Sequence, residues 1–261
     1  LMLDGMTGWE NDYFGSLDAD VIDGMRIGVM EFSRSDNPRL NAQFDAAMSR
    51  LEAAGATLVR IDSFDRPADF WGASRLVLNV EFKEYINQYL SSSPANIPVR
   101  SLSELIAFNN ENAEVEQAVF GQDIFENSLA APGIESEEYQ TALMLVRKAT
   151  RDDGIDALLS EYDVKVLVGP SGPISSRVDV ANGDVWPPWA GAGSMAAVSG
   201  YPNLTVPMGT IAGIPVGISF MSGQGSDSLV MSVGVAFEQM GSGSPVPGYQ
   251  NTVDLDVMSR L

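Results

Sequence analysis

The feature that most constrains the fold is a strand, a helix and a second strand that follow one another closely near the start of the chain. Residues 25–30 and 57–61 are short apolar runs of the kind that form buried strands. Between them, Asn37 and Pro38 are typical of a helix start, and Gly55 is typical of a helix end. Two strands joined by one helix favour parallel pairing through a right-handed crossover. The sequence therefore predicts an α/β fold.

The rest of the pattern adds a helical middle and three further strands. Residues 67–162 are helical by pattern, with a helix near 114–127 and a long one that Ser136 opens and that runs to about Leu158. After an irregular stretch comes a small-residue helix at 193–200, and Ser226 caps a final helix. Strands are expected at 164–168, 203–208 and 215–220. We expect one domain over residues 1–240 with a helix-rich insertion at 67–162, and a tail at 241–261.

Composition excludes several classes of chemistry. The 261 residues include neither Cys nor His, which rules out a thiol nucleophile, a Ser-His-Asp triad and the common zinc sites within this chain. The net charge of −20 argues against a nucleic-acid partner, because binding phosphates needs a basic surface. No apolar run approaches the roughly 20 residues that a membrane helix needs, so no membrane contact is expected. The compartment stays open between cytoplasmic and exported.

The strongest candidate site is the loop of sequence Gly-Pro-Ser-Gly-Pro at residues 169–173, directly after an apolar strand. Ligands of open α/β sheets bind beyond the carboxyl ends of the strands, so Pro170, Ser171 and Gly172 are candidate substrate contacts. A stiff turn that only redirects the chain explains the same residues. The pattern leaves both interpretations open.

The segment that follows offers amide, carboxylate and aromatic groups. Asn182 and Asp184 lack the spacing of a calcium loop, which favours a turn and leaves amide binding open. Trp186 and Trp189 fit a pocket wall or a core equally well. The three lysines lie on expected helices or strands, away in sequence from any Gly- and Ser-rich loop, and are interpreted as surface side chains: Lys83, Lys148 and Lys165.

Several segments together resemble the C-terminal part of the amidase signature family. The most specific is Gly-Tyr-Pro-Asn-Leu-Thr-Val-Pro-Met-Gly at residues 200–209, and residues 166–173, 182–184 and 213–220 fit as well. Earlier segments, among them 81–85, 101–109 and 121–122, resemble the peptide-amidase-like branch. The resemblance implies a mixed central sheet with helices on both faces, incomplete because only the C-terminal portion is matched.

The family resemblance also implies a reaction, the hydrolysis of carboxylic or peptide amides to acid and ammonia. In that family one Ser attacks the amide, a second Ser relays a proton and a Lys is the base. The Ser-Ser-Lys signature region has no counterpart in this sequence, so no catalytic residue is assigned and the chain alone is expected to be inactive. Because the sequence begins at Leu1 rather than Met, we expect it to be part of a longer or processed polypeptide.

By the same resemblance, the chain contributes framework and pocket wall, with a small amide as substrate and a missing N-terminal amidase half as partner; a homodimer is left open. No cofactor and no metal are expected. The candidate substrate contacts are Pro170, Ser171, Gly172, Asn182, Asp184, Trp186 and Gln122, with Phe120 as a further candidate. Two other functions stay open: part of a glutamine-hydrolysing amidotransferase subunit, and a non-catalytic binding or scaffold domain.

Overall fold

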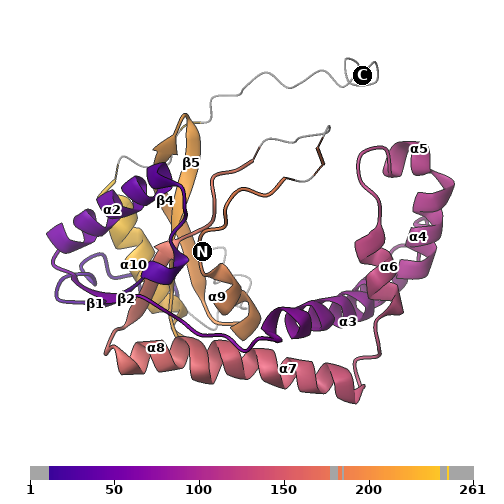
Figure 1. The fold of residues 1–261 in the computed structure, drawn as a ribbon, viewed down its shortest axis with the longest axis horizontal. Coiled ribbons are helices and arrows are strands. Elements are labelled where there is room, and N and C mark those ends of the chain that lie inside the picture. Colours follow the sequence, from indigo (N-terminus) through magenta and orange to yellow (C-terminus); the bar gives the residue numbers. More distant parts are fainter. Residues whose placement is uncertain (1–11, 177–181, 184, 242–245, 247–261) are drawn as a thin grey trace.

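A mixed sheet forms the centre of the computed structural model, which describes residues 12–176, 182–183, 185–241 and 246 (Figure 1). In this part of the chain the sheet has five strands in the order β2-β1-β3-β5-β4. β1 (Arg26–Met30) pairs in parallel with both β2 (Thr57–Ile61) and β3 (Val166–Pro170). β5 (Ile214–Met221) pairs antiparallel with β3 and with β4 (Asn203–Ile211). The expected α/β class and mixed sheet are confirmed.

Helices cover both faces of the sheet because side chains alternate along each strand. Val166 and Val168 of β3 point into a core shared with α2 (Pro38–Ala53) and α10 (Asp227–Gln239). Leu167 lies on the opposite face, in a second core with α8 (Asp156–Glu161) and α9 (Gly193–Ser199). β3 is buried along its whole length, so it is the central strand in position and in environment.

Local signals explain where the helices begin and end. The Asn37 side chain accepts a hydrogen bond from the backbone N–H of Arg39 at 3.0 Å, and Pro38 is the first residue of α2. Gly55, with φ +94°, follows the end of the helix in the left-handed conformation. The crossover from β1 through α2 to β2 therefore forms as its sequence predicts.

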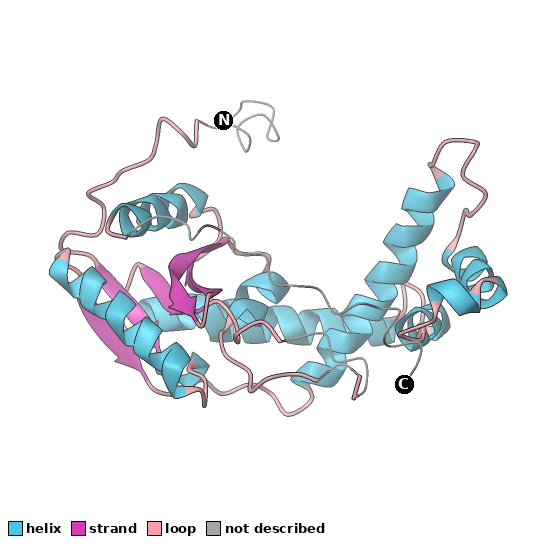
Figure 2. Cartoon of the chain, turned by 90° about the horizontal axis from the view of Figure 1, so that it is seen from above, coloured by secondary structure: helices cyan, strands magenta, loops and turns pink. Residues whose placement is uncertain are grey.

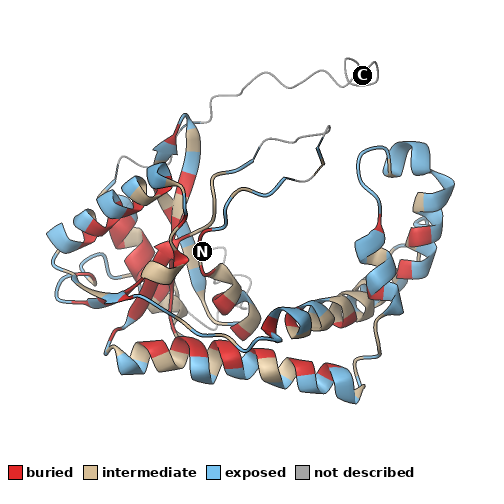
Figure 3. Cartoon of the chain, in the orientation of Figure 1, coloured by how far each residue is buried: buried red, intermediate tan, exposed pale blue. Residues whose placement is uncertain are grey.

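The helical middle forms an arm that extends away from the sheet (Figures 1 and 2). Its longest member is α3 (Phe70–Ser91), whose far end carries the short helices α4 (Leu102–Glu111), α5 (Ala113–Glu116) and α6 (Asp123–Ala130). α7 (Glu137–Thr150) returns along α3, and the Tyr139 hydroxyl donates a hydrogen bond to Glu81 of α3 at 2.8 Å. Figure 3 shows that buried residues gather at the sheet and become sparse along the arm.

Two sequence-based helix predictions differ from the structure. The single helix expected near 114–127 is instead α5 and α6, because residues 117–122 leave the helical conformation between them. The long helix expected from Ser136 to about Leu158 is interrupted by a π-type turn at Arg151–Ile155. Gly154 there has non-helical angles, and a Cβ on it would lie 2.8 Å from the carbonyl oxygen of Ala149. Periodicity alone does not detect a break that keeps the apolar face in place.

Replacing Phe220 of β5 with alanine tests the core. Phe220 is fully buried and packs edge-on against Phe237 of α10, with ring centroids 5.5 Å apart. Because the cavity would not collapse fully, we expect Phe220→Ala to lower the free energy of unfolding by about 3–5 kcal/mol in urea denaturation. The control is Phe120→Ala, at a 56% exposed side chain, which should change it by less than about 0.5 kcal/mol. Equal losses in the two variants would contradict the assigned core.

Candidate active-site edge of the sheet

The candidate site lies where the parallel strands β1 and β3 end. Parallel strands present their carboxyl ends at one edge, so the residues after β1 and after β3 meet there. β1 runs into a short 3-10 turn, η1 (Glu31–Ser33), and β3 runs into Ser171 and Gly172. A Cβ on Gly169 would lie 2.6 Å from the Ser33 hydroxyl oxygen, which shows how closely the two ends approach. Pro170 is buried, whereas Ser171 and Gly172 are half-buried.

Ser171 is held by β5 of the antiparallel hairpin through two hydrogen bonds. Its backbone N–H donates to the carbonyl of Gly217 at 2.9 Å. Its hydroxyl oxygen accepts a hydrogen bond from the Ser219 hydroxyl at 2.9 Å, and the Ser219 and Thr205 hydroxyl oxygens are also 2.9 Å apart. Three hydroxyls from β4, β5 and the end of β3 therefore form one chain. Sequence analysis singled out only Ser171 of the three, because strand pairing alone brings Ser219 to Ser171 and Thr205 to Ser219.

Residues 185–190 lead back to the same edge. The Gly191 N–H donates to the Ser33 carbonyl at 2.7 Å, and Ala190 and Ala192 are buried on either side. Trp186 and Trp189 contact each other with ring centroids 6.2 Å apart and are 68% and 62% exposed. These rings do not fill a core. Asn182 is exposed, and Asp184 lies outside the described residues.

Gln122 immediately precedes α6, which lies in the helical arm apart from the strand ends (Figure 1). Its side chain is buried and fully engaged there. The amide oxygen accepts from Asn109 at 3.1 Å, and the amide nitrogen donates to Asn110 Oδ1 at 2.7 Å and to the Ile106 carbonyl at 3.3 Å. These bonds tie α6 to α4. The structure does not bring Gln122 together with Ser171, and Phe120 beside it is exposed.

The Gly-Tyr-Pro-Asn block at residues 200–203 forms the junction between α9 and β4. Gly200 ends α9 in the left-handed conformation, with φ +72°. The Tyr201 hydroxyl donates to Asp156 of α8 at 2.7 Å. Burial, and to a smaller extent this hydrogen bond, raises the pKa of Tyr201. Arg151 stacks its guanidinium over the Tyr201 ring, 5.6 Å from the centroid. The packing of α9 and β4 on α8 therefore explains this block.

The described side chains at this edge offer hydroxyls but no base. Lys83 donates to the Ala131 carbonyl in the arm, Lys148 pairs with Asp153, and Lys165 is exposed at the opposite end of β3. Within the described ranges, no group of three or more Asp or Glu side chains is placed to hold a metal ion. What the edge can do chemically, on these residues, is bind and orient a polar group.

The comparisons with known proteins fit this fold. The profile of the Amidase family matches residues 10–231. A probable amidase of Arabidopsis thaliana is 32% identical over 166 residues, which cover 63% of this chain and 28% of the plant protein. The solved peptide amidase of Stenotrophomonas maltophilia is 30% identical with a TM-score of 0.80, covering 92% of this chain and 48% of that one.

The mixed α/β fold thus has its counterpart in a solved peptide amidase, and this chain belongs to the amidase family. One subunit of the glutamyl-tRNA(Gln) amidotransferase of Tropheryma whipplei is also similar, at 24% identity over 84% of this chain and 41% of that protein. The chain spans about half the length of the solved peptide amidase it matches. Among the described helices, none is both long and apolar enough to cross a membrane.

A pair of glycine substitutions tests the close approach at the strand edge. Gly191 has φ +93°, and a Cβ there would lie 2.7 Å from the Pro170 carbonyl oxygen; Gly213 has φ +81° with open space around it. Gly213→Ala should therefore cost about 1–2 kcal/mol from backbone conformation alone. Gly191→Ala adds the backbone clash, for which we expect about 1–3 kcal/mol more in urea denaturation. Equal losses for both variants would contradict the assigned contact.

Proposed function

We propose that this chain supplies framework and substrate contacts to an amide-hydrolysing serine enzyme whose nucleophile and lysine base belong to the rest of the amidase fold. The observation that carries the proposal is Ser171, a strand-end serine whose described side-chain partner is another hydroxyl, that of Ser219. A nucleophilic serine needs a base within hydrogen-bond reach, and the three lysines of the chain lie elsewhere. Membership of the amidase family supports the reaction class.

The substrate contacts that we propose are the residues of the strand edge and its loop. Ser171 and Gly172 are half-buried beside the closely packed Gly191, and Trp186 adds an exposed aromatic surface. The resemblance extends the set to Pro170, Asn182 and Asp184. Gln122 is also in the set that the resemblance implies. Its side chain, however, lies in the arm, where it links α6 to α4 and does not reach the strand edge.

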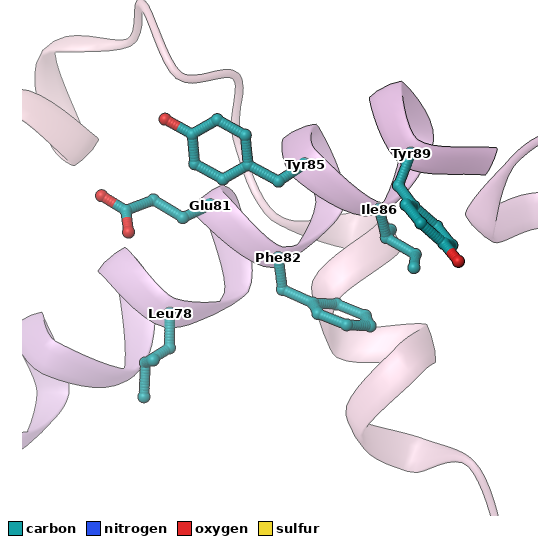
Figure 4. A pocket seen from close by; sticks show the side chains of 6 residues that line it. All are labelled: Leu78, Glu81, Phe82, Tyr85, Ile86 and Tyr89. Carbon is teal, nitrogen blue, oxygen red and sulfur yellow. The ribbon is translucent and has the colours of Figure 1, made fainter. Parts of the chain in front are cut away.

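An exposed apolar surface on α3 supports the proposed partner, the remaining part of an amidase fold. A shallow groove of about 390 Å³ runs along one side of this helix (Figure 4). It is lined by Leu78, Glu81, Phe82, Tyr85, Ile86 and Tyr89. Leu78, Tyr85 and Tyr89 are 61%, 55% and 69% exposed. Large contiguous apolar surface of this kind marks a contact with further protein.

Arg66, just before α3, points to the same partner. Its guanidinium lies 5.3–5.5 Å from the ring centroids of Phe64, Phe70 and Trp71, and burial lowers its pKa. Its Nε atom is buried without a hydrogen-bond partner in the described structure. A buried donor left unpaired is costly, so a backbone carbonyl or carboxylate of the missing part would stabilise this position. Trp71 beside it is 60% exposed at the start of α3.

Reconstitution tests the proposed function. The 261-residue chain would be produced alone and together with the N-terminal remainder of the Stenotrophomonas maltophilia peptide amidase, and ammonia release measured on a peptide amide, an aliphatic amide and glutamine. We expect no turnover by the chain alone, because it lacks a base, and turnover of amides by the assembly.

The peptide amidase itself, split at the corresponding point, is the control for assembly of two parts. Turnover by the pure chain alone would overturn the division of roles. Preference for glutamine would favour the amidotransferase function, which the Tropheryma whipplei relative supports. A stable assembly that hydrolyses none of the amides would favour a non-catalytic binding domain.

Leu78→Asp tests the α3 surface. Because Leu78 is 61% exposed, the isolated chain should lose less than about 0.5 kcal/mol of unfolding free energy. Burying the new carboxylate against the partner should weaken assembly by at least about tenfold in an affinity titration. Met144→Asp, at a 65% exposed position on α7 outside the groove, is the matched control. Unchanged affinity for Leu78→Asp would remove α3 from the interface.

A further inference from the structure

The hydroxyl chain at the strand edge has a direction that the residue types alone do not reveal. Thr205 lies on β4 directly opposite Ser219 of β5, and Ser219 lies next to the end of β3, where Ser171 follows. Both oxygen–oxygen distances are 2.9 Å. Ser219 is 2% exposed, so the middle of the chain is removed from solvent.

Counting the hydroxyl protons determines the direction of donation along this row of hydroxyls. A serine hydroxyl has one proton to donate, and Ser219 donates it to Ser171. The contact between Thr205 and Ser219 is therefore made by the Thr205 proton. Ser171, the last of the three hydroxyls, accepts the Ser219 proton. Among the described residues, no acceptor is bonded to the Ser171 proton. Ser171 is only half-buried, so its hydroxyl proton is free to be donated to a bound ligand.

The surrounding backbone holds this donor in place. The Ser171 N–H is bonded to the Gly217 carbonyl, and a Cβ on Gly217 would lie 2.8 Å from the Ser171 hydroxyl oxygen. Only glycine at position 217 leaves room for the hydroxyl where it is. Hydrogen bonds in a chain polarise one another, so the terminal O–H of Ser171 is a stronger donor than an isolated serine.

The geometry points to Ser171 as a donor to a substrate carbonyl oxygen that is not the one under attack. This inference rests on the proposed function. A nucleophile would need a base to accept its proton, whereas the side-chain partner of Ser171 donates to it. No described Lys or Arg side chain is bonded to Ser171, Ser219 or Thr205, which favours a neutral acceptor over a carboxylate. Substrates with a second carbonyl, such as peptide amides, therefore fit better than simple amides.

Kinetics of the reconstituted assembly test this role with two substrates, a dipeptide amide and an aliphatic primary amide that has no second carbonyl. Ser171→Ala should raise KM for the dipeptide amide by about tenfold, the usual value of one hydrogen bond to a bound substrate, and change kcat by less than about twofold. KM for the aliphatic amide should not change. Ser175→Ala, at an exposed residue of the same loop, is the control and should leave both substrates unaffected.

Thr205→Val keeps the test valid if Ser171→Ala disturbs folding, because Thr205 is exposed and valine has nearly the same shape. Thr205→Val removes the hydroxyl that donates to Ser219, which weakens the polarisation of the Ser171 O–H. KM for the dipeptide amide should therefore rise by about twofold to threefold, and KM for the aliphatic amide should not change. Unchanged KM, or an equal rise for both substrates, would overturn the inference.

Direct binding separates this inference from the proposed function. If the unmutated assembly hydrolyses neither substrate, the proposed function fails, but the dissociation constant of the dipeptide amide can still be measured by NMR titration. Weaker binding after Ser171→Ala than after Ser175→Ala would support the donor role. Equal dissociation constants for the two variants, or no binding to the unmutated assembly, would overturn it.

Discussion

The pairing of β3 with two neighbours of opposite direction supports the rest of the structure. On one side β3 runs parallel to β1, and on the other it runs antiparallel to β5. All five of its residues are buried, so it carries the contacts of both hydrophobic cores. Because its carboxyl end lies beside β1 on one side and the β4–β5 hairpin on the other, the residue that follows, Ser171, meets the Ser219 hydroxyl of the hairpin. The change of strand direction therefore creates the candidate site.

Glycine makes this edge possible at points of close approach. Gly169 leaves room for Ser33, Gly217 leaves room for Ser171, and Gly191 passes next to the carbonyls of Pro170 and Ser171. A larger residue at any of these positions would push apart segments that come from different strands. The Gly-Pro-Ser-Gly-Pro loop is thus both a stiff turn and the wall of a polar edge, and its two interpretations from sequence do not exclude each other.

The sheet and the helical arm differ in how completely their apolar side chains are buried. Such a difference is expected of a chain that packs against the rest of a larger amidase fold. The sheet end has two hydrophobic cores and closely packed strand ends. The arm carries exposed aromatic and aliphatic side chains on α3, and a buried, unpaired Arg66 Nε lies at its base. Its own polar contacts, such as those of Gln122, hold the short helices together. The described residues thus separate polar groups at the edge from apolar surface on the arm.

The sequence by itself determined the family and most of the helices and strands, though not the breaks within two predicted helices. The caps at Asn37, Ser101 and Ser136, the apolar strands and the small-residue helix are local signals, because each depends on neighbours a few residues away. The absence of Cys and His likewise limits the chemistry that the chain can perform, because it removes a thiol nucleophile and an imidazole base whatever the fold.

Tertiary structure alone decided which of these residues meet. The break between α5 and α6, the place of Gln122 in the arm and the chain from Thr205 through Ser219 to Ser171 all depend on contacts between distant segments. The physical reason is that strand pairing and register, which no local pattern specifies, set the distance between hydroxyls 14 and 48 residues apart.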